Sequence, residues 1–306
     1  MPQSNSSALE RVIVAKSQQV AGFPVRRVLP SRQRRRVGPW TFIDHMGPAR
    51  LTPDRPMRVP PHPHLNLATV TYLFEGELVH RDSLGSCQSI QPGAINWMHA
   101  GRGVVHSETS PVPLTPAAEH LHGLQLWLAL PREREESDPW FQHTPAVALP
   151  LLAFVGGEAR VLIGEALGTK SPARVESPTL LIDVSLSAGA RLDLPSSALE
   201  LAAYVVSGRV AFEGTEAEPG HLLVFGSASA VLGRGELRAL EESRVVLLGG
   251  APLDGERFMF WNFVSSSRER LEEAKATWKQ GPQPGTRFPP IPFDSGDFVP
   301  LPKNLA

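Results

Sequence analysis

The sequence predicts an all-β protein of two β-barrels with one short helix near the C-terminus. Three observations support this fold class. The 306 residues include 30 prolines and 26 glycines, which favours many short strands joined by tight turns. Runs of β-branched and aromatic residues recur between turn signals along most of the chain. A second set of such runs repeats the first in weaker form, which is typical of a duplicated domain.

Size, charge and cysteine content narrow the classes of function. A chain of 306 residues suits two domains, which we expect at residues 1–140 and 141–306. The formal net charge of -1 gives no general attraction to nucleic acid or to an anionic membrane. Cys87 is the only cysteine, and residues 1–20 lack the pattern of a secretory signal. No apolar run approaches the roughly 20 residues that span a bilayer, so we expect a cytoplasmic protein that binds no membrane.

The first strands are expected at residues 11–14, 23–29 and 40–46. Six arginines lie between Arg26 and Arg36, without interleaved aromatic residues. A basic cluster of this kind is typical of a solvated loop that pairs with acidic groups, and nucleic-acid binding is not expected from it.

Two short dyads enclose the next strands. His62 and His64 lie in Pro-His-Pro-His, and His106 and Glu108 end the motif Gly-Arg-Gly-Val-Val-His-Ser-Glu. Residues two apart on a strand share a face, so each dyad presents both of its side chains in one direction. If the two strands are neighbours, three imidazoles and one carboxylate meet at one point. That set of ligands predicts a site for a divalent metal ion.

Between the dyads, residues 69–78 read Thr-Val-Thr-Tyr-Leu-Phe-Glu-Gly-Glu-Leu, a β-rich run broken by glycine. Turn signals follow at residues 82–85 and 91–93, and a short apolar strand follows at residues 94–98. Farther along, residues 120–130 alternate like a barrel strand, and they carry a rival pair, His120 and His122. Spacing alone leaves the choice between the two histidine pairs open.

Several of these motifs together resemble the pirin family of the cupin superfamily. The similarity rests on His-Pro-His, Thr-Val-Thr-Tyr, His-Arg-Asp-Ser-Leu-Gly, Asn-Trp-Met and the closing Ala-Gly-Arg-Gly-Val-Val-His-Ser-Glu. The resemblance implies cupin barrels, that is, double-stranded β-helices of jelly-roll type. It also implies that the metal ligands are His62, His64, His106 and Glu108, in preference to His120 and His122. His122 and Gln125 remain candidates for hydrogen-bond partners of the ligands.

Three imidazoles and a carboxylate suit iron(II), manganese, nickel, copper or zinc, and affinity alone does not choose among these ions. An ion that takes six ligands keeps positions open for water, dioxygen or a bidentate substrate. Glu108 is the expected catalytic residue, because a carboxylate at the metal can accept the proton of an incoming hydroxyl. The pirin resemblance implies iron(II) as the metal.

Some bacterial pirins open the flavonol quercetin by 2,3-dioxygenation. We therefore expect a dioxygenase whose partners are dioxygen and a flavonol-like or other ortho-oxygenated aromatic compound. The resemblance also supports an alternative, a non-enzymatic iron-binding regulator of a transcription factor or a metabolic enzyme. A metal-stabilised scaffold without turnover is a third reading.

The second half repeats the barrel pattern without the ligands. Tyr204-Val-Val-Ser-Gly echoes Tyr72-Leu-Phe-Glu-Gly, and nine of the ten histidines precede residue 144. At the positions that match His62, His64 and His106 stand three other residues, namely Leu194, Ser196 and Gly233. We expect this second barrel to bind no metal.

The helix is expected after Ser266-Ser267, where Ser266 is the expected cap because Glu269 stands three residues after it. Leu271, Ala274 and Trp278 recur at helical spacing, and Gly281-Pro282 ends the helix. The proline-rich tail from residue 281 onward is expected to follow the surface in extended form.

Overall fold

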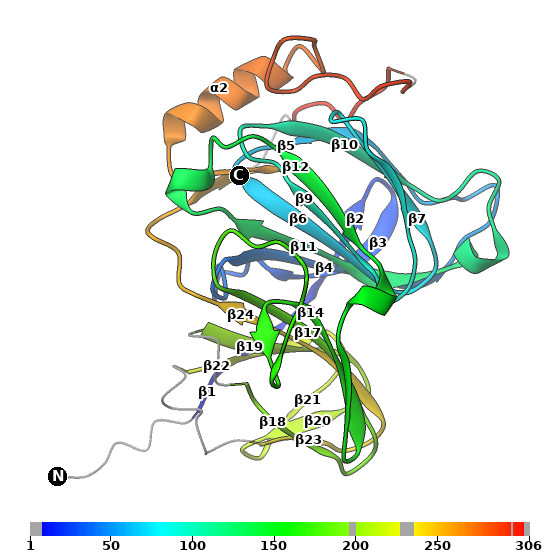
Figure 1. Ribbon diagram of the computed structural model, residues 1–306, viewed down its shortest axis with the longest axis vertical. Coiled ribbons are helices and arrows are strands. Elements are labelled where there is room, and N and C mark those ends of the chain that lie inside the picture. Colours follow the sequence, from blue (N-terminus) through cyan, green and yellow to red (C-terminus); the bar gives the residue numbers. More distant parts are fainter. Residues whose placement is uncertain (1–7, 196–199, 227–235, 295, 303–306) are drawn as a thin grey trace. The chain divides into compact units, whose positions relative to one another are not determined.

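The computed structural model describes residues 8–195, 200–226, 236–294 and 296–302, and strands dominate it (Figure 1). The chain forms two compact units. One contains the described parts of Met1–Lys16, Arg26–Ile43 and Val147–Pro252, and the other contains those of Ser17–Val25, Asp44–Ala146 and Leu253–Ala306. Each unit holds one β-barrel, which confirms the expected fold class. We call the unit that includes Asp44–Ala146 the first barrel and the other the second barrel.

The first barrel is built on two sheets. Seven strands form the larger sheet, in the order β12 (Trp140–Thr144), β9 (Ile95–His99), β6 (Leu67–Glu75), β11 (His120–Ala129), β4 (Trp40–Arg50), β3 (Phe23–Leu29) and β2 (Lys16–Val20). This larger sheet includes residues 26–29 of β3 and 40–43 of β4, which fall in the residue ranges of the other unit. Four strands form the smaller sheet, in the order β5 (Arg58–His64), β10 (Val104–Thr109), β7 (Leu78–Asp82) and β8 (Cys87–Ile90). β6 is apolar and buried along almost its whole length, as its β-branched and aromatic sequence predicts.

The second barrel repeats this arrangement. Its larger sheet runs β1 (Leu9–Val14), β22 (His221–Phe225), β19 (Glu200–Ser207), β24 (Ser243–Gly250), β17 (Thr179–Leu186), β14 (Gly157–Ile163) and β13 (Leu151–Phe154). Its smaller sheet runs β18 (Arg191–Asp193), β23 (Glu236–Ala239), β20 (Val210–Phe212) and β21 (Thr215–Ala217). Tyr204 on β19 and Tyr72 on β6 are both fully buried, in line with the predicted duplication. Ser196 and Gly233 lie outside the described residues.

The remaining elements are short. They are the hairpins β15 (Glu165–Ala166) with β16 (Thr169–Lys170) and β25 (Phe258–Phe260) with β26 (Phe263–Ser265), the 3-10 turns η1 (Pro116–Ala118), η2 (Arg132–Arg134) and η3 (Ala146–Ala148), and helix α2 (Arg268–Trp278). The described helices are too short or too polar to pass through a bilayer.

The two units differ from the expected division at residues 140 and 141. β1 pairs with β22, so the N-terminal strand belongs to the second barrel. Helix α2, orange in Figure 1, packs beside β5 and β10 of the first barrel. Its buried residues Leu271 and Trp278 share a core cluster with Leu65 and Val105. The helix and tail therefore belong to the first barrel, because their apolar face is buried there.

Helix α2 forms where the sequence predicts it, but its N-cap is one residue later than the expected Ser266, because the Ser266 hydroxyl donates to Glu135 instead. Ser267 is the N-cap, and its hydroxyl accepts a hydrogen bond from the backbone N–H of Arg270 at 3.2 Å. Leu271, Ala274 and Trp278 are buried. After the helix, Gly281 adopts a φ of +74°, a left-handed conformation that suits glycine at a helix end.

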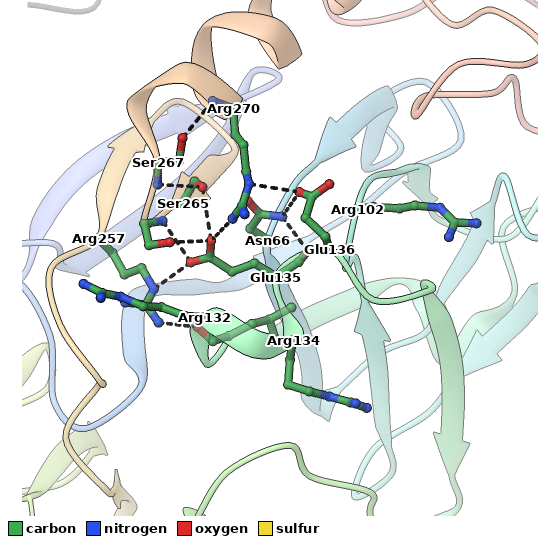
Figure 2. A network of polar contacts seen from close by, with 12 residues as sticks. Asn66, Arg102, Arg132, Arg134, Glu135, Glu136, Arg257, Ser265, Ser267 and Arg270 are labelled. Carbon is green, nitrogen blue, oxygen red and sulfur yellow. Dashed lines mark hydrogen bonds and ion pairs between the residues drawn. The ribbon is translucent and has the colours of Figure 1, made fainter.

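A buried carboxylate fastens the C-terminal segment to the first barrel (Figure 2). Glu135 is fully buried and forms ion pairs with Arg257 at 2.9 Å and with Arg270 at 2.6 Å. The backbone N–H and the hydroxyl of Ser266 donate to the same carboxylate at 2.9 and 2.8 Å. The Ser265 hydroxyl donates to it at 3.3 Å. Two cations and three further donors compensate the buried charge, so residues 253–270 are held at one place on the barrel.

Candidate metal centre

The two predicted dyads lie on adjacent strands. β5 pairs antiparallel with β10, and His62 lies opposite His106 while His64 lies opposite Val104. Beyond His64 the chain turns at Asn66, which has a φ of +56° and directs its side-chain amide at the carbonyl oxygens of Gly101 and Glu135. This turn fixes the end of the strand that carries both histidines.

Two glycines set the start of β10. A Cβ on Gly101 would come within 2.1 Å of the carbonyl oxygen of Ser137, and one on Gly103 within 2.5 Å of the carbonyl oxygen of Arg287. Both glycines also have positive φ values, +47° and +139°. Only glycine allows these close approaches, so the Gly-Arg-Gly motif places His106 by bringing β10 against two neighbouring segments.

The structure brings His62, His64 and His106 together. One nitrogen from each ring can be chosen so that all three lie within 4.8 Å of one another. The three residues are only 7%, 1% and 0% exposed. A buried cluster of three imidazole nitrogens at this spacing is a donor set for a divalent metal ion.

Hydrogen bonds decide which nitrogen of each ring faces the centre. His62 Nδ1 lies 2.8 Å from the carbonyl oxygen of Pro60, which leaves Nε2 for the centre. The carbonyl of Asn262 accepts a hydrogen bond from the His64 ring. His64 Nδ1 and His106 Nε2 are buried and have no hydrogen-bond partner among the described residues. Buried polar atoms are rarely left unpaired, and a metal ion would satisfy these nitrogens.

The three histidines are kept neutral by their surroundings. Burial lowers the pKa of His62 to about 4, and the backbone contact with Pro60 offsets part of this effect. Burial, reinforced by repulsion between the histidines, holds the pKa values of His64 and His106 well below 6.5. A metal ion binds the neutral form of imidazole, so near neutral pH these ligands need lose no proton.

Glu108 is buried but does not belong to the group of atoms within 4.8 Å. The pairing of β10 with β5 shifts register between His106 and Glu108. The Thr71 hydroxyl lies 3.4 Å from Glu108 Oε1 and 2.8 Å from Gln125 Oε1. Burial raises the pKa of Glu108, because the charged carboxylate loses its hydration. The four expected ligands thus occupy one buried region, with three of them in the tight cluster.

The rival pair, His120 and His122, does not belong to the cluster of three histidines. His122 Nε2 lies 2.7 Å from His45 Nε2, and the two rings stack with centroids 4.9 Å apart. His120 is exposed. Gln125 does reach the expected region, because it shares the Thr71 hydroxyl with Glu108.

Two further residues near the cluster, His80 and Asp82, were missed in the sequence. His80 Nδ1 lies 3.3 Å from His106 Nδ1, and His80 Nε2 lies 3.0 Å from Asp82 Oδ2. The signal was available, since His80 and Asp82 are two apart on one strand, as His62 and His64 are. The backbone of Asn262 could not be anticipated, because it is 198 residues from His64 in the chain.

The buried histidines predict that the stability of the metal-free protein depends on pH. In the unfolded chain His62 titrates near 6.5, whereas in the folded chain its pKa is about 4. Between these values the unfolded state binds more protons, so the free energy of unfolding falls as pH is lowered through this window. The contribution from His62 alone is on the order of 3 kcal/mol. Urea unfolding from pH 7 to pH 4 measures this effect, and the slope should be smaller for His62→Gln. A slope in His62→Gln equal to that of the wild type would contradict it.

Comparisons with known proteins give a consistent result. The pirin family model matches residues 22–128, and the model of the pirin C-terminal cupin domain matches residues 181–284. A pirin-like protein of Caulobacter vibrioides is 45% identical over 298 residues, which cover 96% of this chain and all of that protein. Human pirin is 31% identical over 259 residues, which cover 83% of this chain and 85% of that protein. The crystal structure of quercetin 2,3-dioxygenase from Acinetobacter baumannii superposes with a TM-score of 0.85 at 33% identity, over 97% of both chains.

Proposed function

The chain belongs to the pirin family, and we propose that it is a metal-dependent dioxygenase acting on a flavonol such as quercetin or on another ortho-oxygenated aromatic compound. The observation that supports this proposal most is the cluster of His62, His64 and His106, with two buried nitrogens that have no hydrogen-bond partner among the described residues. The similarity to a quercetin 2,3-dioxygenase over 97% of the chain supports the choice of substrate class.

We propose iron(II) as the resident ion, held by His62, His64 and His106, with Glu108 as a fourth ligand. When bound, such an ion would supply Lewis acidity and redox chemistry toward dioxygen. The protein contributes three buried, neutral imidazoles, whose pKa values burial has lowered. Manganese, nickel, copper and zinc fit the same nitrogen donors.

Glu108 is the proposed catalytic base. Its carboxylate is buried, and a carboxylate at the metal can accept the proton of a phenolic hydroxyl. The Thr71 hydroxyl lies 3.4 Å from this carboxylate and 2.8 Å from Gln125 Oε1. A substrate hydroxyl that enters beside the histidines would transfer its proton to Glu108 and bind as the anion.

The proposal is tested with iron-loaded protein in an oxygen electrode. We expect oxygen uptake with quercetin that stops when a chelator removes the ion. Absence of uptake with quercetin and with a panel of catechols, in protein that retains its iron, would reject the enzymatic function. That outcome would favour the alternative, a non-enzymatic iron-binding regulator.

Glu108→Gln is expected to lower the rate of oxygen uptake by about 10²- to 10⁴-fold, the usual contribution of a general base. The three imidazoles remain in this variant, so most of the metal should be retained. Oxygen-electrode rates and elemental analysis of the same preparation separate the two effects. An unchanged rate would exclude Glu108 as the base.

A further inference from the structure

His80 and Asp82 form a buried link behind His106. Both lie on β7, which pairs with β10 so that Asp82 is opposite His106 and His80 is opposite Glu108. They are only 4% and 0% exposed. Burying polar side chains of this kind costs free energy unless their atoms form hydrogen bonds. Each polar atom of this pair is therefore expected to have a partner.

Asp82 is held from two sides. Its Oδ1 accepts hydrogen bonds from the backbone N–H groups of Leu84 and Ser86, both at 2.9 Å. Its Oδ2 lies 3.0 Å from His80 Nε2. The His80 ring is also fixed by stacking on Phe141, with centroids 4.5 Å apart and an interplanar angle of 15°.

With His80 neutral, these contacts determine where the ring protons lie. A carboxylate only accepts hydrogen bonds, so the contact with Asp82 requires the His80 proton to be on Nε2. The Nδ1 of a neutral His80 is then an acceptor. His106 Nδ1, which lies 3.3 Å from it, must therefore carry a proton and donate. This leaves His106 Nε2 without a proton, and Nε2 is the buried nitrogen that has no hydrogen-bond partner among the described residues.

We propose that Asp82 is a positioning residue that sets the tautomer and ring orientation of His106 through His80. The inference rests on the proposed metal site, where His106 must present an unprotonated Nε2. Ligand histidines usually donate their second ring N–H to a carboxylate, a carbonyl or water. Here the acceptor for the His106 N–H is the imidazole of His80, whose own N–H donates to Asp82. Stacking on Phe141 holds the His80 ring in this orientation.

Asp82→Asn tests this inference with little change of shape. The N–H groups of Leu84 and Ser86 require the amide oxygen at the Oδ1 position, so the amide nitrogen faces His80. That nitrogen donates, so His80 Nε2 becomes the acceptor and the proton moves to His80 Nδ1. His106 Nδ1 must then accept, and the His106 proton moves to Nε2, where it points at the metal position.

The direct measurement is ¹⁵N NMR of the histidine rings in metal-free protein, with signals assigned by His80→Gln and His106→Ala. We expect the Nδ1–H form of His106 and the Nε2–H form of His80 in the wild type, and both reversed in Asp82→Asn. The Nε2–H form of His106 in the wild type would overturn the inference even if the variant does not fold. Unchanged tautomers in a folded variant would also overturn it. Because no metal is present, this result does not depend on the proposed function.

A second measurement addresses the metal, with zinc(II) and manganese(II) as probes in competition with a chelator. Asp82→Asn should weaken binding by about 10- to 100-fold, as loss of an outer partner of a ligand does. Ser83→Ala is the matched control. It removes a hydrogen bond from Val105 N–H to the Ser83 hydroxyl, 3.1 Å long, in the same turn, and should leave the affinity within about threefold of wild type. Equal affinities in the two variants would show that Asp82 only shapes the turn and would contradict the inference.

Discussion

Replacing His106 by alanine is expected to remove the bound metal and the oxygen uptake while both barrels stay folded. His106 supplies one of three nitrogens in the cluster, and its Nε2 has no other partner among the described residues. Mutation of a residue that hydrogen-bonds to a metal ligand typically lowers metal affinity by about 10- to 100-fold. The loss in His106→Ala should be larger, because the ligand itself is removed. Elemental analysis, oxygen uptake and circular dichroism of one preparation measure the three properties.

His120→Ala is the matched control for this experiment. His120 belongs to the rival His-x-His pair but is exposed on β11, so its removal should leave the metal content unchanged. If His106→Ala retains the metal and His120→Ala loses it, the assignment of the ligands is wrong. If His106→Ala unfolds the first barrel, the metal-stabilised scaffold becomes the better reading.

Glu135→Ala is expected to destabilise the first barrel by about 3 kcal/mol or more, the range for breaking a buried ion pair. Glu135 compensates Arg257, whose side chain is 3% exposed, and it also binds Arg270 and Ser266 (Figure 2). Asp254 still pairs with Arg257 in the variant, which keeps the loss toward the lower end of the range. Urea unfolding followed by tryptophan fluorescence gives the free energy.

Glu136→Ala is the control, because Glu136 is the next residue but its side chain is 41% exposed and its ion pairs with Arg270 and Arg287 are long, at 3.8 and 3.7 Å. Exposed pairs contribute at most about 1 kcal/mol. Equal losses in the two variants would contradict the role given to Glu135. Glu135→Ala should also weaken metal binding, because Asn262, whose backbone carbonyl contacts His64, lies in the segment that Glu135 fastens.

Much of the fold could be predicted from the sequence because its signals are local. Alternation and turn residues indicate strands, and the helix has a cap, a buried face and a stop. The partner of an edge strand is not a local property. Nothing in residues 9–14 indicates that β1 pairs with β22, more than 200 residues away. In the same way, the apolar face of α2 predicts burial but does not name Leu65 and Val105 as its neighbours.

The candidate site likewise has features that local sequence signals predict and features that depend on strand pairing. Period-2 spacing places His62 with His64, and the structure brings His106, which was expected from the second dyad, beside them. The position of Glu108 depends on a register shift in the pairing of β10 with β5, which the spacing of two residues does not reveal. His80 and Asp82 show the same spacing of two residues on β7, but only the pairing with β10 gives them a role.

The central claim is that His62, His64 and His106 hold one divalent ion, and anomalous diffraction from zinc-loaded crystals tests it most directly. The account predicts one strong peak in the first barrel, at roughly 2.0–2.1 Å from each coordinating nitrogen. Those nitrogens are His62 Nε2, His64 Nδ1 and His106 Nε2. Peaks confined to other groups, with these three nitrogens unbound at saturating zinc, would contradict it.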